Sequence, residues 1–93
     1  MREILVARER LTDLEGKALG VEYYVLVEEA MLGKTFCCEN YGVRIADSAG
    51  GGEAVSNITV STRRIDELME LLVRNRVTPA ALRDVVEDWL AAG

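Results

Sequence analysis

The chain has 93 residues, a formal net charge of −5 and a pI near 4.7. This acidic balance argues against nucleic acids and anionic membranes as partners, because the chain would repel their phosphates. The length predicts a single domain over residues 1–93 with one hydrophobic core. No run of residues approaches the roughly 20 apolar positions that a membrane-spanning helix needs. No cleavable signal is recognisable at the N-terminus, so we expect a cytoplasmic protein.

The first 60 residues predict an antiparallel meander of three to four strands. Val21–Val27 is the clearest strand, because its residues are mostly β-branched or aromatic and alternate ones fall on one face. A first strand fits the apolar run that follows Glu3, although the start of a helix over Ala7–Leu11 fits the same residues. A bulge is expected in the third strand near Gly42, where glycine permits one. The predicted strands are Glu3–Arg10, Val21–Val27, Thr35–Ile45 and Glu53–Val60.

Residues 61–93 predict a helical hairpin. The apolar period changes after the last strand, and the stripe Ile65, Leu68, Met69 and Leu72 follows the spacing of an amphipathic helix. Ser61 or Thr62 is the expected N-cap of this helix. Asp66 and Glu67 are expected in its first turn, where the helix dipole favours negative charge.

The second helix has a well-marked start. Thr78 is the expected cap, and Pro79 occupies the first helical position, where its missing N–H group costs nothing. Trp89 is interpreted as a large core residue that anchors this helix. Strands followed by helices predict an α+β fold, with both helices packed on one face of the antiparallel meander.

The residue types that most often carry catalysis are scarce. The chain has no histidine, which excludes imidazole bases and imidazole metal ligands. Cys37 and Cys38 are adjacent, so in a strand their side chains point to opposite faces and do not share one metal ion. We interpret them as small half-buried residues, with a vicinal disulfide or a redox-active thiol as the alternative. The sequence therefore predicts no metal site, no cofactor and no catalytic residue.

Clustered carboxylates are the remaining candidates for enzymatic chemistry. The clusters in the predicted helices lie opposite the apolar stripes, which is typical of solvated surface residues. No nucleophile or acid–base pair is recognisable, so we expect a protein that is not an enzyme. The sequence also indicates no particular small-molecule ligand.

A cluster of hydroxyl and guanidinium groups lies at the start of the first predicted helix. Ser61, Thr62, Arg63 and Arg64 place these groups beside free backbone N–H groups, where a phosphate or a partner's carboxylate would dock. The alternative is a capped helix start with arginines paired to nearby carboxylates. We carry the four residues as a candidate anion or partner site.

The central predicted strand is apolar on both faces. Tyr24 and Leu26 lie opposite the face formed by Val21, Tyr23, Val25 and Val27. A sheet with one solvated face shows cleaner alternation than this. Either the sheet curls strongly around a helix, or the second face packs against another subunit. Tyr24 and Leu26 are therefore candidate interface residues for a second copy or another protein.

Three segments together resemble a family of short bacterial proteins from Gram-positive anaerobes that is known only as a domain of unknown function. The segments are Val21–Glu28, Tyr41–Val43 and Pro79–Leu90. The resemblance extends over nearly the whole chain and implies a single cytoplasmic domain. It implies no activity, cofactor or site residue.

Two functional hypotheses follow. The first is a small non-catalytic interaction or regulatory module, a homodimer that acts through its sheet surface or an exposed strand edge. The alternative is a nucleic-acid-binding or transcription-regulatory protein, since two short helices meet near residues 75–78. Asp84, Glu87 and Asp88 on the second helix argue against that alternative, because a recognition helix needs positive charge.

Overall fold

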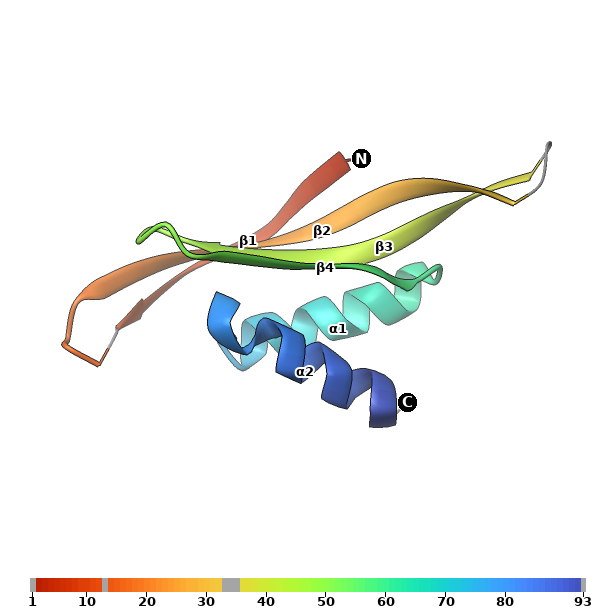
Figure 1. The fold of residues 1–93 in the computed structure, drawn as a ribbon. Coiled ribbons are helices and arrows are strands. Elements are labelled where there is room, and N and C mark those ends of the chain that lie inside the picture. The colour runs from red at the N-terminus through yellow and green to blue at the C-terminus, as the bar shows by residue number, and fades with distance from the viewer. Residues whose placement is uncertain (1, 13, 33–35, 93) are drawn as a thin grey trace.

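The fold is an α+β arrangement of one antiparallel sheet and two C-terminal helices, as predicted. The structure is a computed structural model that describes residues 2–12, 14–32 and 36–92, without the side chains of 30–32, 36 and 37. The strands follow the order β1-β2-β3-β4 in a simple meander, and both helices lie on one face of the sheet (Figure 1). The elements are β1 (Arg2–Thr12), β2 (Ala18–Leu32), β3 (Phe36–Asp47), β4 (Gly52–Thr59), α1 (Thr62–Arg74) and α2 (Pro79–Ala92).

The first two strands are longer than the sequence predicts. β1 continues to Thr12 and pairs with β2 throughout, so the alternative of a helix starting at Ala7 is wrong. β2 begins at Ala18, which shortens the predicted turn region to the few residues between these strands. Paired neighbours supply backbone hydrogen bonds to residues whose own strand propensity is weak, and this pairing extends both strands beyond their apolar runs.

The core lies between the sheet and the helices. The alternation predicted for β2 is confirmed, because the side chains of Val21, Tyr23, Val25 and Val27 are all buried on the helix side. Val43 and Ile45 continue this face on β3. The helices bury the predicted stripe of α1 and, from α2, Leu82 and Val86.

Helix α1 begins after an N-cap at Ser61, whose hydroxyl accepts a hydrogen bond from the Arg64 N–H at 3.2 Å. The prediction of acidic residues in the first turn is wrong. Because the helix starts at Thr62, Asp66 and Glu67 fall in the second turn, and the first turn carries Arg63 and Arg64. The helix dipole disfavours positive charge at this end of the helix. Each arginine has a favourable contact nearby, Arg63 with Glu67 and Arg64 with the Trp89 ring.

Helix α2 begins at Pro79, as predicted. The segment that precedes it is tied to the centre of the sheet, because the Tyr23 hydroxyl donates a buried hydrogen bond to the Val77 carbonyl at 3.0 Å. Trp89 is only partly buried, although it packs against the core as expected. Arg64 lies over its ring at 4.3 Å, which joins the two helices by a cation–π contact.

The bulge predicted in the third strand lies in β4 instead. β3 pairs with β2 without interruption through Gly42, whereas β4 has extra residues between the partners of Tyr41 and Val43. Asn57 adopts a left-handed φ of 56° within this bulge. The bulged backbone approaches Gly42 so closely that an added Cβ would lie 2.4 Å from the Val55 carbonyl oxygen. Gly42 therefore permits a bulge in its neighbour rather than in its own strand.

Candidate functional site

The N-terminal strand β1 is one edge of the sheet, and it contains a bulge of its own. Leu5 pairs with Tyr24 and Ala7 pairs with Tyr23, so Val6 is an extra residue in the ladder. A bulge of this kind breaks the alternation of side chains between the two faces of a sheet. Ile4, Val6 and Ala7 consequently all lie on the helix side of β1.

Three consecutive large apolar residues of β1 are exposed. The side chains of Ile4, Leu5 and Val6 keep 49%, 40% and 48% of their surface in contact with solvent. The outer side of an edge strand also offers N–H and C=O groups that no neighbouring strand binds. An exposed apolar run on such an edge is typical of a surface that binds another chain.

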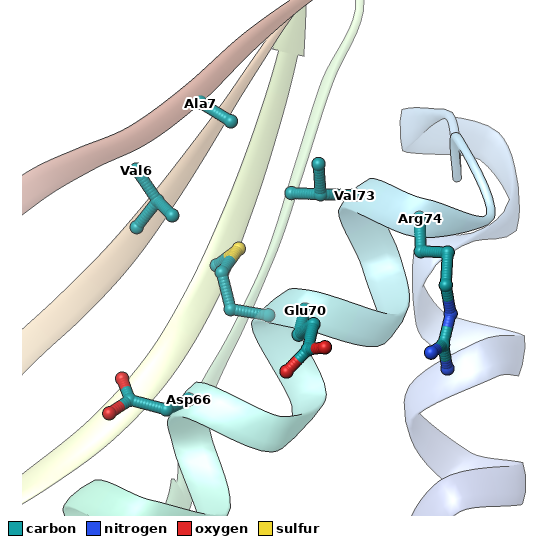
Figure 2. A pocket seen from close by; sticks show the side chains of 7 residues that line it. Val6, Ala7, Asp66, Glu70, Val73 and Arg74 are labelled. Atoms are coloured by element: carbon teal, nitrogen blue, oxygen red, sulfur yellow. The ribbon is translucent and has the colours of Figure 1, made fainter.

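A groove separates this strand from α1 (Figure 2). It has a volume of about 410 Å³, and its apolar lining comes from Val6 and Ala7 on the strand and Met69 and Val73 on the helix. Asp66, Glu70 and Arg74 complete its rim.

The groove continues along β1 into a second recess of about 350 Å³, which shares Val6 and Asp66 and reaches Ile4. Together the exposed edge of β1 and these two recesses form one continuous surface. We call it the β1 surface below.

Charged residues of β1 flank its apolar centre and are paired within the chain. On the face without helices, Glu3 accepts a hydrogen bond from Arg44 at 2.9 Å, and Arg8 donates one to Glu22 at 2.7 Å. The Arg8 hydrogen bond, and after it the Tyr24 hydroxyl, lower the pKa of the Glu22 carboxyl. Signs therefore alternate along this edge at fixed positions.

The predicted interface residues Tyr24 and Leu26 lie on the sheet face without helices. Leu26 is only 3% exposed, and Tyr24 is partly buried beneath Arg44, which lies 4.4 Å from its ring centre. The Tyr24 hydroxyl donates to Glu22, which raises the pKa of the phenol. This face is more polar than the sequence suggested, because β3 contributes Asn40 and Arg44 to it. A partner contact at Tyr24 and Leu26 stays a prediction.

The structure brings the predicted anion-site residues together at the start of α1, but three of them already have partners there. Ser61 caps the helix, Arg63 pairs with Glu67 at 3.2 Å, and Arg64 stacks on Trp89. Thr62 is exposed at the first helical position. This corresponds to the alternative of a capped helix start with internally bound arginines.

Metal-ligating and redox residues give no second site in the part of the chain that the structure describes. No group of three or more Cys, Asp or Glu side chains there is close enough together to hold a metal ion. Cys38 is a partly buried free cysteine on the face without helices. The Cys37 side chain lies outside the described residues, so the interpretation of the cysteine pair stays a prediction. Within the same residues, no helix is long and apolar enough to cross a membrane.

The exposed run on β1 is a functional feature that the sequence reasoning missed. The apolar surplus was placed on Tyr24 and Leu26, whereas the structure exposes Ile4, Leu5 and Val6. A signal was present, because the first strand of a meander is always an edge and this run does not alternate. The Val6 bulge itself left no mark in the sequence, since valine is an ordinary strand residue.

Comparisons with known proteins give one finding. Residues 2–92 match the model of a family described as "Family of unknown function (DUF6514)". Neither the search of curated proteins nor the search of solved structures returned a match. The family match agrees with the resemblance seen in the sequence and extends over nearly all of the chain.

Proposed function

We propose that this chain, which belongs to a family of unknown function, is a small non-catalytic interaction module of the cytoplasm that binds a protein through the β1 surface. One observation carries the proposal: Ile4, Leu5 and Val6 are consecutive, large, apolar and exposed on an edge strand. Pairing with a further strand would satisfy the free backbone groups of β1 and remove these side chains from water. The neighbouring groove would receive apolar side chains of the partner.

No comparable observation favours the nucleic-acid alternative. Asp84, Glu87 and Asp88 are exposed along α2, and they would face a phosphate backbone with the wrong sign. The β1 surface also carries Asp66 and Glu70 on the rim of its groove. Both features suit a protein partner better than a nucleic acid.

Site-specific photocrosslinking tests the proposal. A photoreactive phenylalanine analogue replaces Val6 in cells that produce the protein, and the same analogue replaces the fully exposed Leu14 as the matched control. We expect protein adducts from position 6 and few from position 14, because only the first lies on the β1 surface. An equal or empty adduct pattern at the two positions would contradict the proposal.

A further inference from the structure

We propose that the partner on the β1 surface is a second copy of this chain, bound by antiparallel β1–β1 pairing about a two-fold axis that passes beside Leu5. This inference rests on the proposed function and names its partner. Three observations carry it: the position of the Val6 bulge, the order of charges along β1, and the exposure of the strand centre.

The bulge makes a symmetric pairing possible. In an antiparallel pair with a two-fold axis normal to the sheet, one residue lies opposite itself, and the residues on either side pair in order. Val6 and Ala7 together span one position of the β1 ladder, because their neighbours Leu5 and Ala7 pair with the adjacent residues Tyr24 and Tyr23. Counted in ladder positions, Leu5 is therefore the centre of the segment from Arg2 to Glu9. Without the extra residue this segment would have no central residue.

The charges match in this register. With Leu5 opposite Leu5 of the second copy, Ile4 lies opposite the Val6–Ala7 position, Glu3 opposite Arg8, and Arg2 opposite Glu9. Glu3 and Arg8 both lie on the face without helices, and the other charged pair lies on the helix face. A two-fold axis normal to the sheet preserves these faces. Each charged position therefore meets the opposite sign twice per dimer.

Neighbouring registers match less well. Moving the axis one ladder position to Ile4 places no charged residue of the segment opposite another. Moving it one position the other way, to Val6–Ala7, leaves only Glu3 opposite Arg10. Placing it at Arg8 sets that arginine against itself, which is destabilising. The register centred on Leu5 is therefore the one that the charges of β1 select.

The internal ion pairs extend the match across the axis. Glu3 is bound to Arg44 and Arg8 is bound to Glu22 within each chain. In the dimer these become a row of alternating sign from Arg44 and Glu3 of one copy to Arg8 and Glu22 of the other. The two-fold axis produces this row twice, so one row would lie on each side of the Leu5 pair on the face without helices.

The apolar groove meets its counterpart on the other face. The symmetry keeps the helices of both copies on the same side of a continuous sheet, since the axis is normal to it. Ile4 and Val6 of the two copies then lie side by side beneath the two α1 helices. This contact would remove from water the side chains that the single chain leaves about half exposed.

Charge reversal tests the register. We expect the purified protein to sediment at twice its mass of 10.3 kDa. Glu9→Arg alone sets like charges opposite each other twice, which should weaken dimerisation by about tenfold or more. Arg2→Glu alone does the same and also removes the exposed ion pair of Arg2 with Glu39 within the chain. The two single variants, once mixed, should form a mixed dimer, because each supplies the sign that the other needs. The mixed dimer also shows that each single variant folds, and the double variant should regain the wild-type affinity.

Disulfide trapping tests the axis. In a Cys37→Ser/Cys38→Ser background, Leu5→Cys places a thiol opposite its own copy, within the roughly 4.4–6.8 Å between Cα atoms that a disulfide spans. Arg10→Cys is the matched control on the same face, and its two copies would be about 26 Å apart along the strands. Mild oxidation should give a covalent dimer from the first variant and none from the second.

The outcomes separate the inference from the function on which it rests. A protein that sediments at 10.3 kDa at every concentration, with no crosslink from Leu5→Cys, overturns the second copy as partner. So does a dimer that is insensitive to Arg2→Glu and Glu9→Arg and is not trapped at position 5. In either case adducts from Val6 with a different protein would leave the proposed function standing. The absence of every adduct at that position would remove both.

Discussion

The two edges of the sheet differ in how they are protected. β4 is short, carries a bulge around Asn57, and is covered by α2, whose Arg83 reaches Glu53 at 3.5 Å. β1 is longer, and the helices leave Ile4 and Val6 on their side of it about half exposed, while Leu5 is exposed on the face without helices. The chain therefore closes one edge by its own C-terminal helix and leaves the other with the features of a binding strand.

The order of elements along the chain explains this asymmetry. The helices follow β4 directly and fold back beneath it, so α2 packs mainly on β4 and β3. α1 crosses the sheet and reaches β1 only in part, which leaves the groove beside Met69 and Val73. Two helices of this length do not cover four strands completely. The uncovered part lies at the strand farthest from the helices in sequence.

The largest loss of stability is expected from a core substitution in α2, the helix that covers the β4 edge. Leu82→Ala removes a fully buried side chain of α2 from the core and should lower the free energy of unfolding by about 2–5 kcal/mol. Ile4→Ala, on the open edge, should cost less than about 1 kcal/mol in the monomer, because that side chain is half exposed. Urea unfolding at low protein concentration, followed by Trp89 fluorescence, measures both. Equal losses would mean that the two edges are equally packed.

The second largest loss of stability is expected at Gly42, where the backbones of β3 and β4 approach each other closely. Gly42→Ala should cost about 1–3 kcal/mol, because its Cβ would lie 2.4 Å from the backbone oxygen of Val55. Gly52→Ala is the matched control in β4, since an added Cβ there would lie 3.8 Å from the Ile45 carbonyl oxygen, an ordinary van der Waals contact. Thermal unfolding of the two variants should separate them clearly. Similar melting temperatures would show that β4 moves away at little cost.

A smaller difference separates the covered and open faces of β2. Tyr23→Phe leaves the buried Val77 carbonyl without its donor and should cost about 1–2 kcal/mol. Tyr24→Phe removes a hydrogen bond to Glu22 on the open face and should cost under about 0.5 kcal/mol. Denaturant unfolding of the pair is the measurement. A larger loss of stability from Tyr24→Phe than from Tyr23→Phe would contradict this account, because the exposed hydroxyl would then contribute more than the buried one.

The smallest effect is a dependence on pH beside the open edge. The pKa of Glu22 in the folded chain is below its ordinary value of 4.5, chiefly because Arg8 binds the carboxylate. Its contribution to stability is therefore present above pH 4.5 and is lost as the pH falls through the lower, folded-state pKa. Glu22→Gln should flatten this part of the stability curve. An unchanged slope below pH 4.5 would show that the Arg8 contact does not persist in solution.

Much of the fold was predictable because local signals agreed with it. The alternation around Tyr23, the apolar stripe of α1 and the Thr78-Pro79 start each pointed to the observed element. The position of the β4 bulge was not predictable, because a glycine in β3 is compatible with a bulge in either β3 or its neighbour β4. The choice between Ser61 and Thr62 as the cap shifts the first turn of α1 by one residue and decides whether Asp66 falls in it, whereas Glu67 lies beyond the first turn with either cap.

The candidate site was less predictable than the fold. The apolar run at Ile4–Val6 was visible, but the exposure of Ile4 and Val6 depends on how far α1 reaches across the sheet. Leu26 was predicted from its parity as an interface residue on the face without helices, whereas in the single chain it already has almost no contact with solvent. Both outcomes depend on contacts between distant parts of the chain, which strand periodicity does not describe.

Amide hydrogen exchange, measured residue by residue at low and high protein concentration, tests the pairing of β1 most directly. If β1 binds a second copy, its outward-facing amides near Leu5 become more protected as the concentration rises, while those on the outer side of β4 do not change. Fast, concentration-independent exchange at β1, equal to that at β4, would contradict the conclusion that the chain leaves this edge open for a partner of its own kind.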